Sequence, residues 1–422
     1  MLLRFKSKKT HMMIRSRSLV AAASILLLAL GTAPLTQAGT YSLLYSFNGG
    51  NDGQWPVGGL VKGIDGNYYG TTQGGGTANG GTIFKITPAG VHTVLHSFSG
   101  ADGNFPSSTL TIDLHGVIYG TTYAGGASGL GTVFKLSPQP CAVCSSALGS
   151  WKLTTLYSFS GTPDGKFPVA GLVVDASGNL YGTTGYGGAY NNGAVFKLTG
   201  QGEETIVYSF TGANDGANPL GPLTLDAEGN LYGTTTAGGT DGMGTIFMIT
   251  PAGTESVLHS FAGASSGDGA YPFYSSLTRD SSGNMFGTTL IGGNSGAGAY
   301  GDGFGVVFKL TSAGTESIIY NFCNQSLCAD GDYPTGGVIQ GSSGLFYGTT
   351  SGGYYEGVLF SMSSQGGWGG LHQFWNLGGD GFTPLAILVQ DPSGTMYGTT
   401  YLGGTSSSNH APYWGTVFKY TP

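Results

Sequence analysis

Charged residues are scarce in this chain, and basic residues are the scarcest. Asp, Glu, Lys and Arg together make up 9% of its 422 residues, whereas about 25% is usual. Six of the fifteen Lys and Arg residues lie before residue 18, which leaves nine basic against twenty-two acidic residues in the remainder, a net charge of −13. A surface of this sign argues against nucleic acid and anionic membranes as partners.

Helical periodicity is also missing. Beyond the N-terminal segment, no twelve-residue stretch repeats apolar residues at the spacing of a helix. Glycine instead supplies 80 residues, and aromatic residues make up 12% of the chain. The glycines follow no three-residue period, which excludes collagen, and the aromatic content argues against a disordered chain. The composition therefore predicts short strands joined by glycine turns.

The chain lacks a long apolar run as well. Its longest, Leu19 to Leu30, has twelve residues and is too short to span a bilayer. Basic residues precede this run, and Thr36-Gln37-Ala38 follows it as a plausible cleavage point. This layout predicts a signal peptide over residues 1–38 and one mature domain over residues 39–422 with no membrane span. We therefore expect a secreted protein, extracellular or periplasmic.

Cysteine is rare too, with four residues in two local pairs. Cys141 and Cys144 form the first pair, and Cys323 and Cys328 form the second. In an exported protein such pairs predict small disulfides that tie down loops. The Cys-Ala-Val-Cys sequence of the first pair also resembles a redox or zinc half-site. No second CxxC or nearby histidine pair completes a zinc tetrad, so the disulfide interpretation is preferred.

What the chain has in abundance is one repeated unit. The sequence Tyr-Gly-Thr-Thr occurs six times, and Phe286–Thr289 is a seventh copy. The period of about 50 residues is typical of solenoids, propellers or arrays. Each copy holds four apolar stretches, rich in β-branched and aromatic residues and bounded by Gly, Pro, Asp or Asn. Seven repeats of four strands predict an all-β fold, a seven-bladed β-propeller of antiparallel blades.

The two chain ends give an independent argument for a closed ring. The mature chain begins with a fourth stretch, Tyr41–Phe47, and ends with a third stretch, Gly415–Tyr420. Blade seven therefore lacks its outer strand unless the N-terminus supplies it. Such closure removes a free sheet edge.

Every copy contains Asp-Gly-x-x-Pro between its outer strand and the next inner strand. The seven aspartates are Asp52, Asp102, Asp164, Asp215, Asp268, Asp330 and Asp380. We expect them to ring one face of the disc, where carboxylates favour calcium or sugar hydroxyls. The preferred interpretation is structural, with Asp capping the turn, Gly taking positive φ and Pro starting the strand. No cofactor is expected apart from calcium at this ring.

The Thr-Thr pair of each copy has two interpretations of the same kind. Its hydroxyl groups are suited to binding a glycan, or to satisfying backbone groups of the neighbouring blade. The second interpretation is preferred.

Departures from the repeat point to a ligand site in copies five to seven. Copy five inserts Gly293–Asp302 and copy seven inserts Thr405–Trp414, both in loops of the same predicted face. Aromatic side chains beside carboxylates suit stacking on sugar rings or a peptide, although ornamented loops without a ligand are the alternative. The candidate residues are Asp302, Asp332, Tyr354, Tyr355, Glu356, His410, Tyr413 and Trp414.

Signals for catalysis are weak. The histidines are scattered and no HExxH motif is present, so no catalytic residue is assigned and a non-enzymatic protein is favoured. A glycosidase-type pair of carboxylates, drawn from Asp302, Asp332 and Glu356, is one alternative. The functional hypotheses are a monomeric, secreted scaffold that binds a glycan or protein, a secreted polysaccharide-cleaving enzyme, and a structural extracellular-matrix protein.

The repeat also resembles a known family. The frame Gly-Asn-Leu-Tyr-Gly-Thr-Thr, Gly-Gly, Gly-Thr-Val-Phe-Lys-Leu, Leu-Tyr-Ser-Phe and Asp-Gly-x-x-Pro is similar to the gloeo/verruco (GloVer) tandem repeat over residues 41–422. The resemblance implies exported bacterial proteins, often joined to a C-terminal surface anchor, and implies no activity. This chain reaches Pro422 directly after its last predicted strand, so no anchor is expected.

Overall fold

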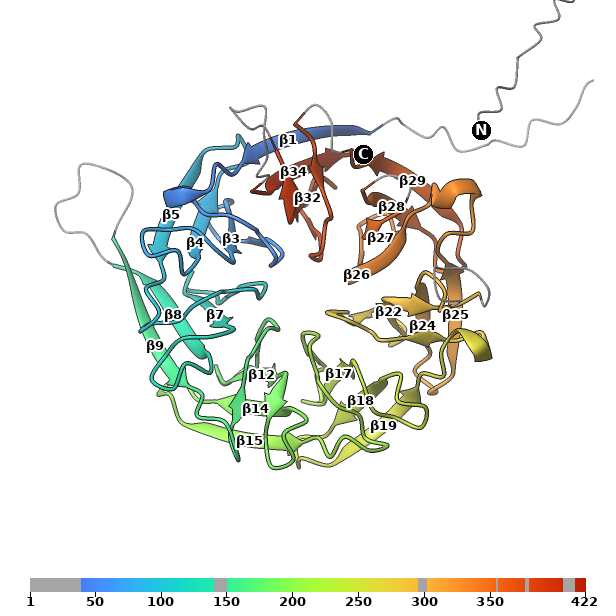
Figure 1. Cartoon of the computed structure of the whole chain (residues 1–422), viewed down its shortest axis with the longest axis horizontal. Helices are drawn as coiled ribbons and strands as arrows, with labels where there is room; N and C mark the ends of the chain where they lie inside the picture. Colours follow the sequence, from blue (N-terminus) through green and yellow to red (C-terminus); the bar gives the residue numbers. More distant parts are fainter. Residues whose placement is uncertain (1–38, 140–149, 295–301, 354–355, 376–378, 405–413) are drawn as a thin grey trace, which may run out of the picture. The chain divides into compact units, whose positions relative to one another are not determined.

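The computed structural model describes residues 39–139, 150–294, 302–353, 356–375, 379–404 and 414–422. Within these residues the strands form seven four-stranded antiparallel sheets. The sheets are arranged as the blades of a ring, which Figure 1 shows along its axis. The predicted all-β, seven-bladed propeller is confirmed.

Each blade runs from an inner strand to an outer strand in chain order. Blade one contains β2 (Val61–Lys62), β3 (Tyr68–Thr72), β4 (Thr82–Ile86) and β5 (His92–Ser97). Blade two contains β6 (Thr111–Ile112), β7 (Ile118–Thr122), β8 (Thr132–Pro138) and β9 (Trp151–Ser158). Blade three contains β11 (Val173–Val174), β12 (Leu180–Thr184), β14 (Ala194–Leu198) and β15 (Glu204–Ser209).

The next three blades repeat this order. Blade four contains β16 (Thr224–Leu225), β17 (Leu231–Thr235), β18 (Thr245–Ile249) and β19 (Glu255–Ser260). Blade five contains β21 (Thr278–Arg279), β22 (Met285–Thr289), β24 (Val306–Leu310) and β25 (Glu316–Asn321). Blade six contains β26 (Asp332–Gln340), β27 (Phe346–Gly352), β28 (Val358–Met362) and β29 (Trp368–Gln373).

Blade seven is completed by the other end of the chain, as predicted. It contains β31 (Val389–Gln390), β32 (Met396–Thr400), β34 (Thr416–Thr421) and β1 (Thr40–Ser46). Strand β1 pairs antiparallel with β34 from Thr40 opposite Thr421 to Ser46 opposite Thr416. Figure 1 shows the two strands side by side at the outer edge of the ring. The pairing leaves no outer edge of β34 free for another chain.

Short elements lie in the loops. The described loops contain the 3₁₀ helices η1 (Gly50–Asp52), η2 (Ala264–Ser266) and η3 (Ser326–Cys328). Small two-stranded sheets pair β10 (Gly165–Lys166) with β13 (Tyr186–Gly187), β20 (Gly269–Ala270) with β23 (Ile291–Gly292), and β30 (Gly381–Phe382) with β33 (Leu402–Gly403). In every blade, such a contact joins the segment before the inner strand to the segment after Thr-Thr.

The glycine of the repeated tetrapeptide is explained by packing inside the blade. In β12, a Cβ on Gly182 would lie 2.7 Å from the Phe196 ring and 2.7 Å from Leu172. Phe196 is fully buried. The same glycine–phenylalanine approach, at 2.5–2.7 Å, occurs in all seven blades. The tetrapeptide is therefore constrained by the core, where Phe burial contributes roughly 2–3 kcal/mol per blade.

The threonines of the tetrapeptide satisfy backbone groups in most copies, as the preferred interpretation predicts. In four copies the first hydroxyl donates to a carbonyl of the next blade, as in Thr121 to Ala170 at 3.1 Å and Thr399 to Gly58 at 3.2 Å. In six copies the second hydroxyl stays within its blade, as where Thr122 donates to the Ala124 carbonyl at 2.9 Å. The hydroxyls of Thr183, Thr184 and Thr349 have no partner among the described residues. Both threonines are buried in all seven copies.

One of the two predicted disulfides is present, between Cys323 and Cys328 in the loop that leads into blade six. The structure does not confirm the other. Cys141 lies outside the described residues, and Cys144 lies outside them as well, so the pairing of Cys141 with Cys144 stays a prediction.

Among the described residues, no helix has the length and apolar character needed to cross a membrane.

Candidate functional site

The seven repeated aspartates lie in the turns that connect one blade to the next. Asp164 illustrates the arrangement: it accepts hydrogen bonds from the Ser160 N–H at 2.7 Å and from the Tyr157 hydroxyl of the preceding outer strand at 3.1 Å. Each of the seven carboxylates accepts such a bond from a turn N–H. These bonds are those that turn capping requires, and calcium binding by the ring stays a prediction.

Each aspartate also pairs with one aromatic side chain on the outer strand. The pairs are Tyr45–Asp52, His96–Asp102, Tyr157–Asp164, Tyr208–Asp215, His259–Asp268, Tyr320–Asp330 and His372–Asp380, at 2.7–3.1 Å. We call them the rim pairs. They join the outer strand of one blade to the turn that enters the next blade.

A third side chain covers each rim pair from the following blade. It stands four residues before the Tyr or His of its own outer strand, in the same register in every blade: Tyr41, His92, Leu153, Glu204, Glu255, Glu316 and Trp368. The Tyr41 ring stacks on His372 at 3.7 Å and the His92 ring on Tyr45 at 4.3 Å. This cover position therefore brings together residues from two neighbouring blades.

The polar cover residues share an unusual feature, a buried polar atom with no hydrogen-bond partner among the described residues. These atoms are the Tyr41 hydroxyl, His92 Nε2, the Trp368 Nε1 and the Oε1 atoms of Glu204, Glu255 and Glu316. Burial raises the pKa of each of the three glutamates to about 7, and a nearby aspartate of the rim pair adds to the increase, while His259 opposes it at Glu316. Such unsatisfied groups are costly unless a proton, water or ion compensates them.

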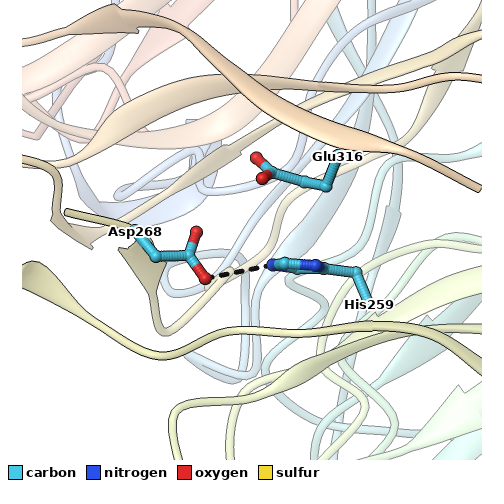
Figure 2. A group of neighbouring side chains, drawn as sticks. All are labelled: His259, Asp268 and Glu316. Atoms are coloured by element: carbon cyan, nitrogen blue, oxygen red, sulfur yellow. Dashed lines mark hydrogen bonds and ion pairs between the residues drawn. The ribbon is translucent and has the colours of Figure 1, made fainter. Parts of the chain in front are cut away.

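One rim cluster contains three side chains of metal-ligating type. Figure 2 shows His259 directed at Asp268, with the Glu316 carboxylate facing them from β25. A ligand atom of each residue lies within 4.8 Å of the other two. No other such group of three occurs in the described part of the chain.

The central channel is lined by all seven blades, with small residues and with apolar side chains such as Val57, Val169 and Leu220. The second residue after the repeated proline is Gly58, Ser108, Ala170, Gly221, Gly336 or Ala386 in six blades, but Tyr274 in blade five. Burial raises the pKa of the Tyr274 phenol, and the phenols of Tyr123 and Tyr186 in blades two and three add to the increase. Tyr274 lines the central cavity together with residues of the other six blades.

A collar of side chains surrounds the entry to the inner strands. We define the collar as the residue before each repeated proline: Trp55, Phe105, Phe167, Asn218, Tyr271, Tyr333 and Thr383. Phe167 stacks on Tyr123 at 4.8 Å and meets Tyr186 edge-on at 6.3 Å. Tyr123 is 38% exposed and Tyr186 43%. Tyr123, Phe167 and Tyr186 form an aromatic patch open to solvent.

All seven collar residues adopt positive φ, between 52° and 60°. This is strained for bulky residues and for any residue before proline. Backbone bonds at the blade junction hold the conformation. The Phe105 N–H donates to the Gly80 carbonyl at 2.9 Å, and its carbonyl accepts from the Tyr123 N–H at 3.1 Å. Strain maintained in this way is a feature of ligand-binding segments.

The sequence-predicted ligand residues fall into two groups. Asp302, Asp332, Glu356 and Trp414 are described, whereas Tyr354, Tyr355, His410 and Tyr413 lie outside the described residues. Burial raises the pKa of the Tyr333 phenol, and the charges of Asp332 and Asp302 raise it further. Trp414 packs near Trp55 at 5.7 Å, and Glu356 is exposed. The structure therefore places Asp302 and Asp332 near one collar residue and Trp414 near another.

The sequence reasoning missed the collar and the cover position. A signal for the collar was present, because five of the seven residues before the repeated proline are aromatic. The signal for the cover position was the glutamate four residues before Tyr208, His259 and Tyr320. Its contact with the previous blade depends on the closed ring.

Comparison with solved structures finds matches at low identity. The extracellular domain of a protein provisionally assigned as a one-component system from Bacteroides thetaiotaomicron has 13% identity and a TM-score of 0.53, and covers 91% of this chain and 41% of its own. A provisional 6-phosphogluconolactonase from Bacteroides uniformis has 13% identity, a TM-score of 0.47 and coverages of 86% and 98%. A glucose dehydrogenase has 15% identity, a TM-score of 0.45 and coverages of 77% and 99%. At these identities the likeness concerns the fold alone.

Comparison with curated proteins gives no match. A family model does match, the Gloeobacter/Verrucomicrobia repeat, over residues 33–146 and 142–301. These segments cover more than half of the chain and contain the frame on which the resemblance was based. The chain belongs to the Gloeobacter/Verrucomicrobia repeat family.

Proposed function

We propose that this protein is a secreted, non-enzymatic propeller that binds a glycan on the face carrying the collar. The observation that carries the proposal is the aromatic patch in which Tyr123 and Tyr186 are exposed and the Phe167 ring between them is half-buried. Flat aromatic faces with a few polar neighbours are the common lining of sites for ring-shaped ligands. Tyr274 lines the channel, and the ligand lies across its mouth.

The predicted ligand residues of copies five to seven belong to the same proposal. Trp414 lies beside the collar residue Trp55, and Asp302 and Asp332 lie beside Tyr333. Carboxylates at this position supply hydrogen-bond acceptors for sugar hydroxyls. The aromatic patch would stack on the ligand and the acidic side would orient it.

Secretion is part of the proposal. The Cys323–Cys328 disulfide is consistent with an oxidising compartment, and residues 1–38 have the sequence of a signal peptide. Detection of the chain beginning near Gly39 outside the cytoplasm of the native cell would support this, and retention of the uncleaved chain inside would contradict it.

A glycan array tests the binding proposal. Labelled wild-type protein is compared with a Tyr123→Ala/Phe167→Ala variant and with Leu114→Ala, whose side chain is 92% exposed at the other end of blade two. Each lost stacking contact is worth about 1 kcal/mol, so the double variant should bind more than about tenfold weaker. Leu114→Ala should bind like wild type. A blank array, or unchanged binding by the double variant, contradicts the proposal.

A second candidate function, polysaccharide cleavage, is favoured by one observation. Asp332 is buried, and burial together with the Asp330 charge raises its pKa to about 6. A carboxyl group that keeps its proton near neutral pH suits a general acid. Product screening on plant and microbial glycans tests this: cleavage lost in Asp332→Asn would support it, and no products from folded wild-type protein would contradict it.

A further inference from the structure

The rim cluster between blades four and five differs from the other six. It alone combines a histidine and an aspartate in the rim pair with a glutamate at the cover position. The cluster before it has Tyr208, Asp215 and Glu255, with tyrosine in place of histidine. Blade two places Leu153 at the cover position after the His96–Asp102 pair. Other blades of the same chain therefore place different residues at the equivalent positions.

The three side chains come from fixed elements. His259 lies on β19, Glu316 lies on β25, and Asp268 lies in the turn between blades four and five. The distance between His259 Nε2 and Asp268 Oδ2 is 3.1 Å. The N–H groups of Ala262 and Gly269 donate to Asp268 at 2.9 and 2.6 Å and hold its carboxylate in place. Hydrogen bonds to a carboxylate in this way fix its orientation for binding a metal ion.

Glu316 adds an unsatisfied acceptor to this cluster, and unlike the same atom of Glu204 and Glu255 it stands beside both a histidine and an aspartate. Its Oε1 atom is buried and has no hydrogen-bond partner among the described residues, although a second carboxylate stands close by. Burial, together with the Asp268 charge, raises the pKa of Glu316 although the His259 imidazole lowers it, so the two partly buried carboxylates are only partly compensated. Figure 2 shows that the oxygen atoms of both carboxylates and one ring nitrogen converge on the same space.

We propose that His259, Asp268 and Glu316 bind a divalent transition-metal ion of the zinc type. One imidazole nitrogen and two carboxylate oxygens are a ligand set that zinc accepts, with solvent completing the tetrahedron. The nitrogen ligand distinguishes this site from calcium and magnesium sites, whose ligands are oxygen atoms. The ion would neutralise both carboxylates and satisfy Glu316 Oε1.

The position of the site assigns it a structural role. A metal ion there would join the outer strand of blade four to the outer strand of blade five. An ion that binds the folded state and not the unfolded state raises stability in proportion to its affinity and concentration. The site lies at the rim, so this inference is independent of glycan binding at the collar.

The test is zinc titration of tag-free protein at pH 7.5, by calorimetry and by thermal melting with zinc or chelator. The variants are His259→Tyr and Glu316→Leu, each of which places a residue that another blade carries at the equivalent position, so both are expected to fold. The matched control is Glu255→Leu in the tyrosine-containing cluster. Calcium serves as the control ion.

Wild-type protein should bind one zinc ion, and its Tm should rise with zinc and fall with chelator. His259→Tyr and Glu316→Leu should each weaken zinc binding by at least about tenfold, while Glu255→Leu should bind zinc like wild type. No zinc binding by the wild type, equal binding by all variants, or a Tm that rises with calcium but not with zinc would each overturn the proposal.

Discussion

The blade core and the collar use the same seven-fold backbone in opposite ways. In the core, the glycine of the tetrapeptide and the phenylalanine that it contacts are the same in all seven copies. In the collar, the backbone is equally regular, with φ between 52° and 60°, but the side chains range from Trp55 to Thr383. The difference shows that packing fixes the residue in the core, whereas no packing requirement fixes it in the collar.

The rim is intermediate between these two regions. Each rim pair keeps its aspartate but has tyrosine in four blades and histidine in three, and the cover position includes residues as different as Leu153 and Glu316. Both features depend on two blades being adjacent. At the rim, therefore, the geometry is the same in every blade and the chemical character of the side chains differs.

The largest effect is expected in the core. Phe196→Ala removes a fully buried ring and should lower the free energy of unfolding by about 3–5 kcal/mol. Phe105→Ala, at a collar position that is 38% exposed, should cost less than about 1 kcal/mol. Denaturant unfolding of both variants measures the contrast. Equal losses would break the distinction between core and collar.

A smaller effect is expected from adding one methyl group to the core. Gly182→Ala would place a Cβ 2.7 Å from Phe196, and such overpacking should cost about 1–3 kcal/mol. Gly200→Ala is the matched control, since nothing lies within 4 Å of its added Cβ. Thermal melting should separate the two variants, and a Gly182→Ala protein as stable as wild type would refute the packing explanation of the tetrapeptide.

The buried glutamate Glu255 at the rim should make the stability of the protein depend on pH. The folded-state pKa of Glu255 is about 7, raised by burial and then by Asp215 from an ordinary value of 4.5. The folded state therefore binds this proton more tightly than the unfolded state does. The contribution of the protonated Glu255 to the free energy of unfolding is fully present below pH 4.5 and is lost as pH rises through 7. Glu255→Leu should remove this loss and be more stable than wild type at pH 8, by roughly 1–2 kcal/mol once solvent screening is taken into account.

Melting curves of wild type and Glu255→Leu from pH 4.5 to 8 measure this effect. As pH rises, the Tm of Glu255→Leu should increase relative to the Tm of wild type. A difference that is constant across this range would show that Glu255 titrates in the folded protein as it does in the unfolded chain.

The smallest effect on stability is expected at the collar backbone. Phe105 has a φ of 57°, which glycine adopts without strain. Phe105→Gly should therefore change stability by less than about 1 kcal/mol, while Phe105→Ala keeps the strain and should be the less stable of the two. A Phe105→Gly protein that melts well below Phe105→Ala would contradict the assignment of strain to this position.

The architecture could be predicted from the sequence because each repeat encodes one blade. Strand order, blade number and closure by Tyr41–Phe47 all follow from local patterns and from where the copies begin and end. The collar and the rim clusters could not be assembled in this way. His259 and Glu316 belong to different copies, and the contact of Phe167 with Tyr123 crosses a blade boundary, so their proximity depends on how blades pack against each other.

The site residues were predicted only in part for a second physical reason. Insertions identify where the chain departs from its repeat, and they led to Asp302, Asp332 and Trp414. The aromatic patch in blades two and three needs no insertion, because its side chains occupy ordinary repeat positions. A search for exposed aromatic residues within the repeat, in addition to departures from it, would have included Phe105 and Phe167.

The most direct test of the central claim is a calorimetric titration of the tightest glycan from the array into wild type and the Tyr123→Ala/Phe167→Ala variant. The account predicts that the two proteins have the same Tm within a few degrees while the variant binds more than about tenfold weaker. Equal affinity in the two proteins would contradict the claim that the collar face is the binding surface.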